Sequence, residues 1–189
     1  MGAMHILAVA GSLRADSINA AFCRAAARLA PPDLSIRVHG ALGSLPLFNA
    51  DLESAPPHEV TALREAVGAA DALIIASPEY AHGVSGVLKN ALDWLVSYEG
   101  FVGKPVAVIN TSPRAHHAYD SLLEVLRTMS ATVVHQASIT VPLLGSCPTE
   151  AEMITTAAIA QQIRGALLAL GSALQSRSMV RPIFPMDPA

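Results

Sequence analysis

The chain has 189 residues, of which 52% are apolar and 14% are charged, and its formal net charge is −3. This composition is too apolar for a disordered chain, and the length is sufficient for a single domain, residues 1–189, with a full core. Its Lys and Arg residues are scattered and form no run that could follow a phosphate backbone, so nucleic acid is not an expected partner.

The first residues carry no basic region of the kind that begins a secretory signal. Met4 is a candidate native start, which would make residues 1–3 an added segment. No apolar stretch is expected to reach the ~18 residues that a membrane span needs. We therefore expect a cytoplasmic protein without a membrane partner.

Two apolar patterns predict the first strand and the first helix. Residues 6–10 form a short apolar run that ends at Gly11, as a buried strand does before a loop. Apolar residues then recur at steps of three and four between residues 17 and 30, and Pro31 follows directly. A strand, a loop and a helix are thus expected by residue 30.

Strand and helix patterns alternate along the rest of the chain. Further strands are predicted at residues 34–39, 72–77, 105–110 and 132–138, and further helices at residues 57–69, 85–98, 119–130 and 150–175. Such alternation requires parallel strands joined by right-handed crossovers. The sequence predicts an α/β fold with a five-stranded, doubly wound parallel sheet and helices on both faces. Residues 42–56 are its longest irregular stretch, and a tail is expected at residues 176–189.

A ligand of such a sheet binds beyond the carboxyl ends of the strands, where the strand order reverses. The loop after the first strand leads into a helix N-terminus, whose N–H groups and dipole favour an anion. Ser12, Ser17 and Asn19 add hydrogen-bonding groups there, and Arg14 adds a positive charge. A terminal phosphate fits this loop, which matches neither a Walker loop nor the GxGxxG pattern. The alternative is that Ser17 is only a helix cap and Arg14 only a solvated charge.

The loop after the third predicted strand suits a flat ligand. Pro78 rigidifies the turn, and Gly83 and Gly86 permit close approach of the backbone. Tyr80 offers an aromatic surface, so the backbone amides of this loop can contact an isoalloxazine edge. His82 is a candidate proton donor, although a lone histidine in a loop is more often solvated or structural.

The loop after the fourth predicted strand is expected beside the other two. Its Ser112 and Arg114 can reach the polar edge of a ring or the phosphate of a nicotinamide. His116 and His117 are adjacent, which points them apart on most backbones. Since no carboxylate or Cys completes a metal-ligand spacing, no metal site is expected.

Three further features have structural explanations. Lys89 and Asp93 lie four residues apart on a predicted helix, which predicts a surface ion pair. Trp94 is expected in the core or in an interface. Cys23 and Cys147 belong to no CxxC pattern and are expected to be reduced, buried thiols.

Together these motifs resemble the NADPH-dependent FMN reductase family, which includes quinone, azo-dye and chromate reductases. The resemblance rests on the segments 11–14, 17–19, 78–80 with Gly83, and 86–94, and residues 45–51 are also similar to the family's loop after strand two. It covers about residues 5–138, in the family's order. It implies a three-layer, flavodoxin-like fold with the strand order 2-1-3-4-5.

The resemblance also implies where the cofactor lies. The FMN phosphate would be held by Ser12, Arg14, Ser17, Ile18 and Asn19. The rest of the predicted FMN-binding set is Pro78, Glu79, Tyr80, Ala81, His82, Gly83, Ser112 and Arg114. No catalytic side chain and no metal ligand are predicted, because the flavin itself supplies the redox chemistry.

The chain departs from the family pattern at two places. The family commonly has Pro where Ser85 stands, which is a minor change. Its third loop is commonly rich in glycine, whereas this chain has Ser-Pro-Arg-Ala-His-His at residues 112–117. How the far edge of the ring and the nicotinamide are received is therefore open.

The predicted function is an oxidoreductase that passes hydride from NADPH or NADH through FMN to a small-molecule acceptor. A quinone, an azo compound, a metal oxyanion and free flavin remain alternative acceptors. The alternative functions are a flavodoxin-like electron carrier, for which a net charge of −3 is small, and an FMN-binding regulatory module without NAD(P)H oxidation. The resemblance also implies a homodimer or a homotetramer, and the high apolar fraction agrees with this expectation.

Overall fold

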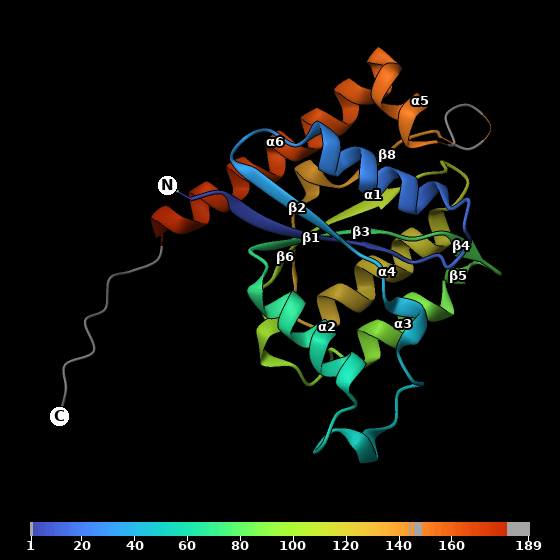
Figure 1. The fold of residues 1–189 in the computed structure, drawn as a ribbon, viewed down its shortest axis with the longest axis vertical. Helices are drawn as coiled ribbons and strands as arrows, with labels where there is room; N and C mark the ends of the chain where they lie inside the picture. Colours follow the sequence, from blue (N-terminus) through green and yellow to red (C-terminus); the bar gives the residue numbers. More distant parts are fainter. Residues whose placement is uncertain (1, 144, 146–148, 181–189) are drawn as a thin grey trace.

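The computed structural model describes residues 2–143, 145 and 149–180. Its centre is a parallel sheet in the order β2-β1-β3-β6-β7, in which β8 also pairs with β6 (Figure 1). The strands are β1 (Met4–Ala10), β2 (Leu34–His39), β3 (Ala72–Ala76), β6 (Pro105–Asn110), β7 (Thr132–Val133) and β8 (Ile139–Thr140). The predicted doubly wound topology and its strand order are confirmed.

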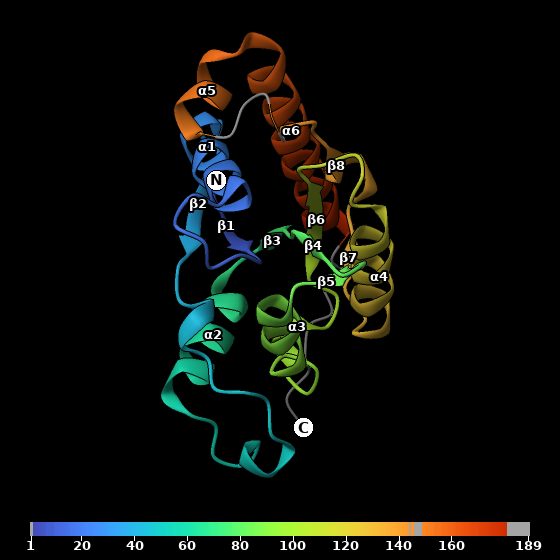
Figure 2. The ribbon, with the colours of Figure 1, turned by 90° about the vertical axis from the view of Figure 1, so that its right-hand side faces the viewer.

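Helices cover both faces of the sheet (Figures 1 and 2). On one face lie α1 (Ile18–Leu29), α5 (Glu150–Thr155) and α6 (Ala157–Val180), and on the other lie α2 (His58–Ala69), α3 (Gly86–Asp93) and α4 (His116–Thr128). In β1, Ile6 and Ala8 join the first core layer, whereas Leu7 and Val9 join the second. Since successive side chains of a strand face opposite sides, burial on both faces explains the uninterrupted apolar runs.

The fifth position of the sheet differs from the single strand predicted at residues 132–138. A 3-10 turn, η4 (His135–Ala137), separates the short strands β7 and β8. At this break the backbone N–H of Val108 in β6 donates to Ser138 Oγ at 3.0 Å, and that hydroxyl donates to the Val134 carbonyl at 3.0 Å. A serine side chain thus takes the place of a backbone acceptor, which lets the edge strand bend.

Helix boundaries also differ from the predicted ones. α3 ends at Asp93 rather than residue 98, and the next carbonyl, that of Trp94, accepts hydrogen bonds from Arg64 at 2.9 and 3.1 Å. α4 begins three residues earlier than predicted, at His116. The final helix is interrupted at Thr156, whose ψ of 104° is extended.

α6 extends through residues 176–180, part of the predicted tail; residues 181–189, the rest of that tail, lie outside the described residues. By length and composition, residues 157–177 of α6 would be sufficient for a membrane span, contrary to the expectation from sequence. One side of this helix, including Ile163, Leu167 and Leu170, is buried in the core against the sheet.

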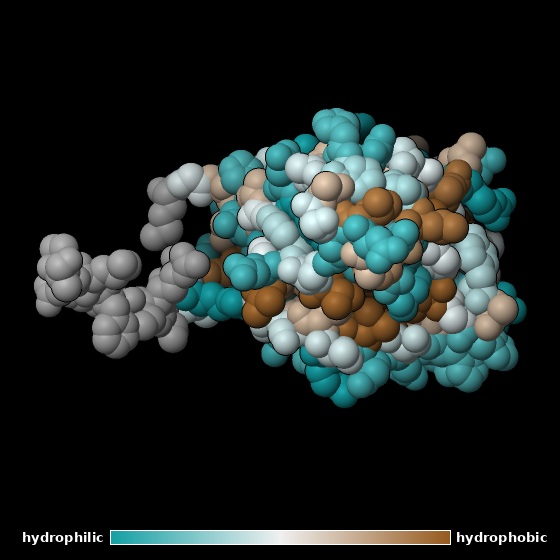
Figure 3. Space-filling model, turned by 90° about the horizontal axis from the view of Figure 1, so that it is seen from below, coloured by the Kyte–Doolittle hydropathy of each residue, from teal (hydrophilic) through white to brown (hydrophobic). Residues whose placement is uncertain are grey.

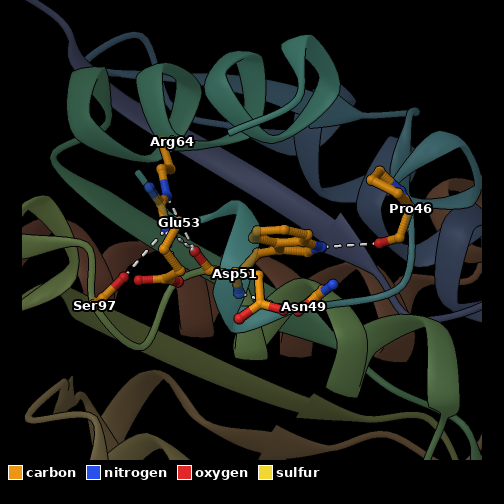
Figure 4. A network of polar contacts seen from close by, with 7 residues as sticks. Pro46, Asn49, Asp51, Glu53, Arg64 and Ser97 are labelled. Carbon is orange, nitrogen blue, oxygen red and sulfur yellow. Dashed lines mark hydrogen bonds and ion pairs between the residues drawn. The ribbon is translucent and has the colours of Figure 1, made fainter. Parts of the chain in front are cut away.

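The irregular segment 42–56 is held firmly against α2 and α3 (Figure 4). The carbonyl of Pro46 accepts from Trp94 Nε1 at 2.8 Å and from Asn90 Nδ2 at 2.9 Å. Arg64 of α2 forms an ion pair with Glu53 at 3.3 Å. Trp94 is fully buried, which confirms its expected place in the core.

Candidate functional site

A cleft of about 860 Å³ opens at the carboxyl edge of the sheet, where the loops after β1, β3 and β6 meet. These are the three loops that the sequence singled out. The cleft is lined by Ser12, Arg14, Asp16, Ser17, Ile18, Asn19, Ser77, Pro78, Glu79, Tyr80, Asn110, Thr111, Ser112, Arg114, Ala115, Gly145 and Glu152. Every residue of the predicted FMN-binding set is among them except Ala81, His82 and Gly83.

The first loop presents the N-terminus of α1 to the cleft. Ser17 is the N-cap, and its Oγ accepts the N–H of Ala20 at 3.2 Å. The N–H groups of Ile18 and Asn19, in the first turn, have no acceptor within the helix. Arg14 is exposed and has no ion pair among the described residues. Ser17 is thus a helix cap, which was the alternative to a role in ligand binding. It also lines the cleft together with the unpaired guanidinium of Arg14.

A buried hydrogen bond joins the first loop to the third. Thr111 Oγ1 donates to Asn19 Oδ1 at 3.1 Å, and both side chains are buried. Within the third loop, Asn110 accepts the N–H of Ser112 at 3.0 Å and donates to the Ala115 carbonyl at 3.3 Å. These bonds fix the backbone of residues 110–115 without using Ser112 Oγ, which remains available to a ligand.

The second loop forms a short antiparallel hairpin, β4 (Glu79–Tyr80) with β5 (Gly83–Val84), which the sequence did not predict. Ala81 and His82 form its turn in the left-handed conformation, with φ of 49° and 58°. This turn lies outside the lining of the cleft, while Tyr80 at its base is exposed toward solvent. Gly83 belongs to β5 with an ordinary negative φ.

Three histidine rings of this region lie against one another, with His82 stacked on His117 and His116 tilted against His117. The rings of His82 and His117 lie 4.3 Å apart, and those of His116 and His117 lie 4.0 Å apart. The expectation that the adjacent histidines point apart was therefore wrong; both belong to the first turn of α4, where their rings come together. No cluster suited to a metal ion occurs within the described residues.

Glu79 is already bonded to the protein itself through one carboxylate oxygen. Its Oε2 accepts the backbone N–H of Ala118 at 2.8 Å, in the first turn of α4. Ala115, the N-cap residue of that helix, has no side-chain acceptor of its own. Glu79 therefore caps α4 from the neighbouring loop.

Sequence reasoning missed several cleft residues. Ser77, Asn110 and Thr111 stand at strand ends beside the chosen ones, so their positions already signalled them. Glu152 comes from α5, beyond the sheet, and only tertiary structure brings it to the cleft. Hydrogen bonds from the Thr149 hydroxyl and backbone N–H lower the pKa of Glu152. The Thr-x-x-Glu spacing predicts this capping box, although not its place beside the cleft.

Sequence comparison identifies relatives of this chain. A family model described as NADPH-dependent FMN reductase matches residues 4–143. A 2-hydroxy-1,4-benzoquinone reductase of Burkholderia sp. is 43% identical over 113 residues, which are 58% of this chain and 61% of that protein. An NAD(P)H-dependent FMN reductase of Pseudomonas aeruginosa is 42% identical over 112 residues, 58% of this chain and 60% of that protein. The chain thus spans about three fifths of the length of these curated relatives.

Among solved structures, a flavoenzyme NAD(P)H:acceptor oxidoreductase of Paracoccus denitrificans has a TM-score of 0.70 and 24% identity. The similarity covers 89% of this chain and 98% of that one, and at this identity it concerns the fold alone. The family match agrees with the motifs on the first two loops and covers every strand of the described sheet. The chain belongs to the NADPH-dependent FMN reductase family.

Proposed function

We propose that this protein binds FMN in the cleft and passes hydride from NADPH or NADH through it to a small-molecule acceptor. The observation that carries the proposal is the convergence of the three loops on one cleft, with a helix N-terminus at one end and a hairpin at the other. The cleft residues suit FMN. N–H groups, hydroxyls and the unpaired guanidinium of Arg14 can bind a phosphate, and the hairpin backbone with the aromatic ring of Tyr80 can contact a flat ring.

At the phosphate end, the N–H groups of Ile18 and Asn19 point out of α1, and the helix dipole favours a dianion there. Ser17 Oγ accepts from Ala20 and still has its own proton to donate. Arg14 and Ser12 complete this end of the cleft. We therefore assign the phosphate to residues 12–19.

At the ring end, Pro78, Glu79 and Tyr80 form one wall, and Ser112 with Arg114 forms the other. The hairpin backbone is fixed by the β4–β5 pairing, so its amide groups are held in place before a ligand arrives. Bound FMN would supply the hydride chemistry, and the protein's part is to bind, orient and exclude water. The exposed guanidinium of Arg114 has no ion pair among the described residues and can receive a phosphate of the nicotinamide cofactor.

A quinone is the acceptor class that we propose, since one relative is named as a benzoquinone reductase and several others as quinone reductases. Anaerobic mixing of the FMN-loaded protein with NADPH tests the function. We expect the oxidised flavin band near ~450 nm to bleach and a benzoquinone to restore it. A band that NADPH and NADH leave unchanged would point instead to an electron carrier or a regulatory module, and a protein that takes up no FMN would contradict the proposal altogether.

Arg14 offers a direct test of the phosphate end. Arg14→Ala should weaken FMN binding about tenfold to a hundredfold, because a charge-assisted hydrogen bond to phosphate is lost. Riboflavin, which lacks the phosphate, should bind both forms equally. Arg164→Ala is the matched control, because Arg164 is exposed on α6 and lies outside the cleft lining. Equal loss of riboflavin and FMN binding in Arg14→Ala would refute the assignment; titration of flavin fluorescence measures both.

We further propose a homo-oligomer and a cytoplasmic location, where the nicotinamide cofactors are available. Large apolar side chains are exposed on the side of α2 and α3, at Leu47, Leu52, Val96 and Val102. Figure 3 shows apolar patches on this face. The network around Pro46 and Glu53 holds the 42–56 segment in place, so Leu47 and Leu52 are presented on a fixed surface (Figure 4).

A further inference from the structure

Glu79 lies in the motif that would contact the ring, yet its carboxylate is bonded to another element. Glu79 Oε2 accepts the N–H of Ala118 at 2.8 Å, across 39 positions of sequence. The first N–H groups of a helix need acceptors from outside the helix. Because the N-cap residue is Ala115, whose methyl group cannot accept, Glu79 supplies the missing acceptor.

The same bond joins two walls of the cleft. Glu79 belongs to the hairpin that lines one wall, and α4 directly follows the third loop, which carries Ser112 and Arg114. Beside it, the stacked rings of His82 and His117 make a second contact between the hairpin and the first turn of α4. A carboxylate at a helix N-terminus is also favoured by the helix dipole.

We infer that Glu79 is a positioning residue, which locks the hairpin to α4 and so sets the spacing between the two walls that receive the flavin ring. The inference deepens the proposed function and rests on it for the identity of the ligand. The lock itself is a property of the polypeptide without cofactor. The side chain of Glu79 is half-buried, whereas His82 and His117 are exposed. The Glu79 hydrogen bond is therefore better shielded from water than the contact between the two histidine rings.

Three substitutions of Glu79 separate the effects of its negative charge, the length of its side chain and its ability to accept a hydrogen bond. Glu79→Ala removes the acceptor, Glu79→Asp shortens it by one methylene, and Glu79→Gln keeps an uncharged acceptor. Glu124→Ala is the matched control, because Glu124 lies on the same helix and only pairs with Arg127 at the surface. We expect hydrogen exchange of the hairpin, residues 79–84, to quicken about tenfold in Glu79→Ala and less in Glu79→Gln. The control should exchange as the wild type does.

The double variant Glu79→Ala/Ala115→Ser distinguishes positioning from simple capping. Ser at the N-cap can accept the same N–H of Ala118 that Glu79 now accepts, so α4 regains its cap while the link to the hairpin stays broken. The melting temperature, lowered by about 2–4 °C in Glu79→Ala, should largely recover. Hairpin exchange should remain fast, and the FMN dissociation constant should remain about tenfold raised.

The apo-protein measurements keep this inference separate from the proposed function. If the wild type takes up no FMN, the proposed function fails, while hairpin exchange still decides whether Glu79 locks the two elements. If Ala115→Ser restores both hairpin protection and FMN affinity, Glu79 is only a remote cap and the inference is overturned. It is equally overturned if hairpin exchange in Glu79→Ala matches that of the wild type.

Discussion

At the scale of single residues, the close packing beside the cleft depends on Gly11 having no side chain. A Cβ at Gly11 would lie 3.0 Å from Ser85 Oγ and 3.1 Å from Leu88 Cβ. Ser85 itself caps α3, with its Oγ accepting the N–H of Leu88 at 3.4 Å. Ser85, where the family commonly has proline, therefore has a local role as a cap, and the absence of a Cβ at Gly11 leaves room for it after β1.

We expect Gly11→Ala to lower the free energy of unfolding by about 1–3 kcal/mol, because the buried cap and Leu88 must move. In urea denaturation, this loss of stability appears as a lower midpoint concentration with an unchanged dependence of the free energy of unfolding on urea. Gly86→Ala is the control, since a Cβ there meets nothing within 4 Å and alanine favours a helix. If the urea midpoint of Gly11→Ala equals that of the wild type, α3 can move to accommodate the added methyl group without loss of stability, and the prediction is wrong.

Cys23 gives a second prediction at this scale. Burial raises the pKa of its thiol to about 12, because the thiolate cannot be solvated. In a Cys147→Ser background, where Cys23 is the remaining cysteine, the folded protein should not react with a thiol reagent at pH ~8, and unfolding in urea should release one reactive thiol. Rapid reaction of the folded protein would contradict this burial. Cys23 is free and buried, which confirms the expectation for this residue. Cys147 lies outside the described residues.

At the scale of elements, helix ends were harder to predict than helices. The apolar patterns located α1 to α4 and predicted α5 and α6 as one helix, because an apolar face must be buried whatever the ends do. The ends depend on partners from other segments, as at Trp94, whose carbonyl is taken by Arg64 of α2, and at Ala118, whose N–H is taken by Glu79. Such partners are not adjacent in sequence, so no local pattern reveals them.

The capping box of α5 predicts a dependence on pH. The pKa of Glu152 lies below its ordinary value of 4.5 because the Thr149 hydroxyl and N–H donate to the carboxylate. Such a group stabilises the fold above its unfolded pKa, and this contribution is lost as the pH falls through the folded value. Glu152→Gln should therefore melt at a lower temperature than the wild type near pH ~7, and the difference should shrink near pH ~3. A difference that stays constant with pH would exclude this role.

At the scale of the whole molecule, the apolar surface on the side of α2 and α3 predicts self-association. Leu47 is 83% exposed, on a segment that hydrogen bonds hold in place. Leu47→Glu should shift the protein toward monomers in light scattering, because a charge would be buried without a partner. Leu168→Glu is the control, on α6 at the other face and 59% exposed. A wild type that is monomeric at every concentration would refute the oligomer.

The sequence alone determined the order of strands and helices along the chain and singled out the three loops that line the cleft. These features follow from apolar periodicity and from the parallel topology that alternation enforces, both of which are local or topological. It also predicts a phosphate site on the first loop, because Arg14, Ser17 and Asn19 stand on one loop that enters one helix. Single-domain organisation of residues 1–189 stays a prediction.

Only the tertiary structure decided how the loops face one another. The Thr111–Asn19 bond joins residues 92 positions apart, and Glu79 bonds the hairpin to α4 across 39 positions. Glu152 of α5 comes to the same cleft as the first loop. Their partners are chosen by packing of α1, α4 and α5 around the sheet. The physical reason is that a hydrogen bond depends on spatial distance, which the order of residues fixes within an element and leaves undetermined between elements.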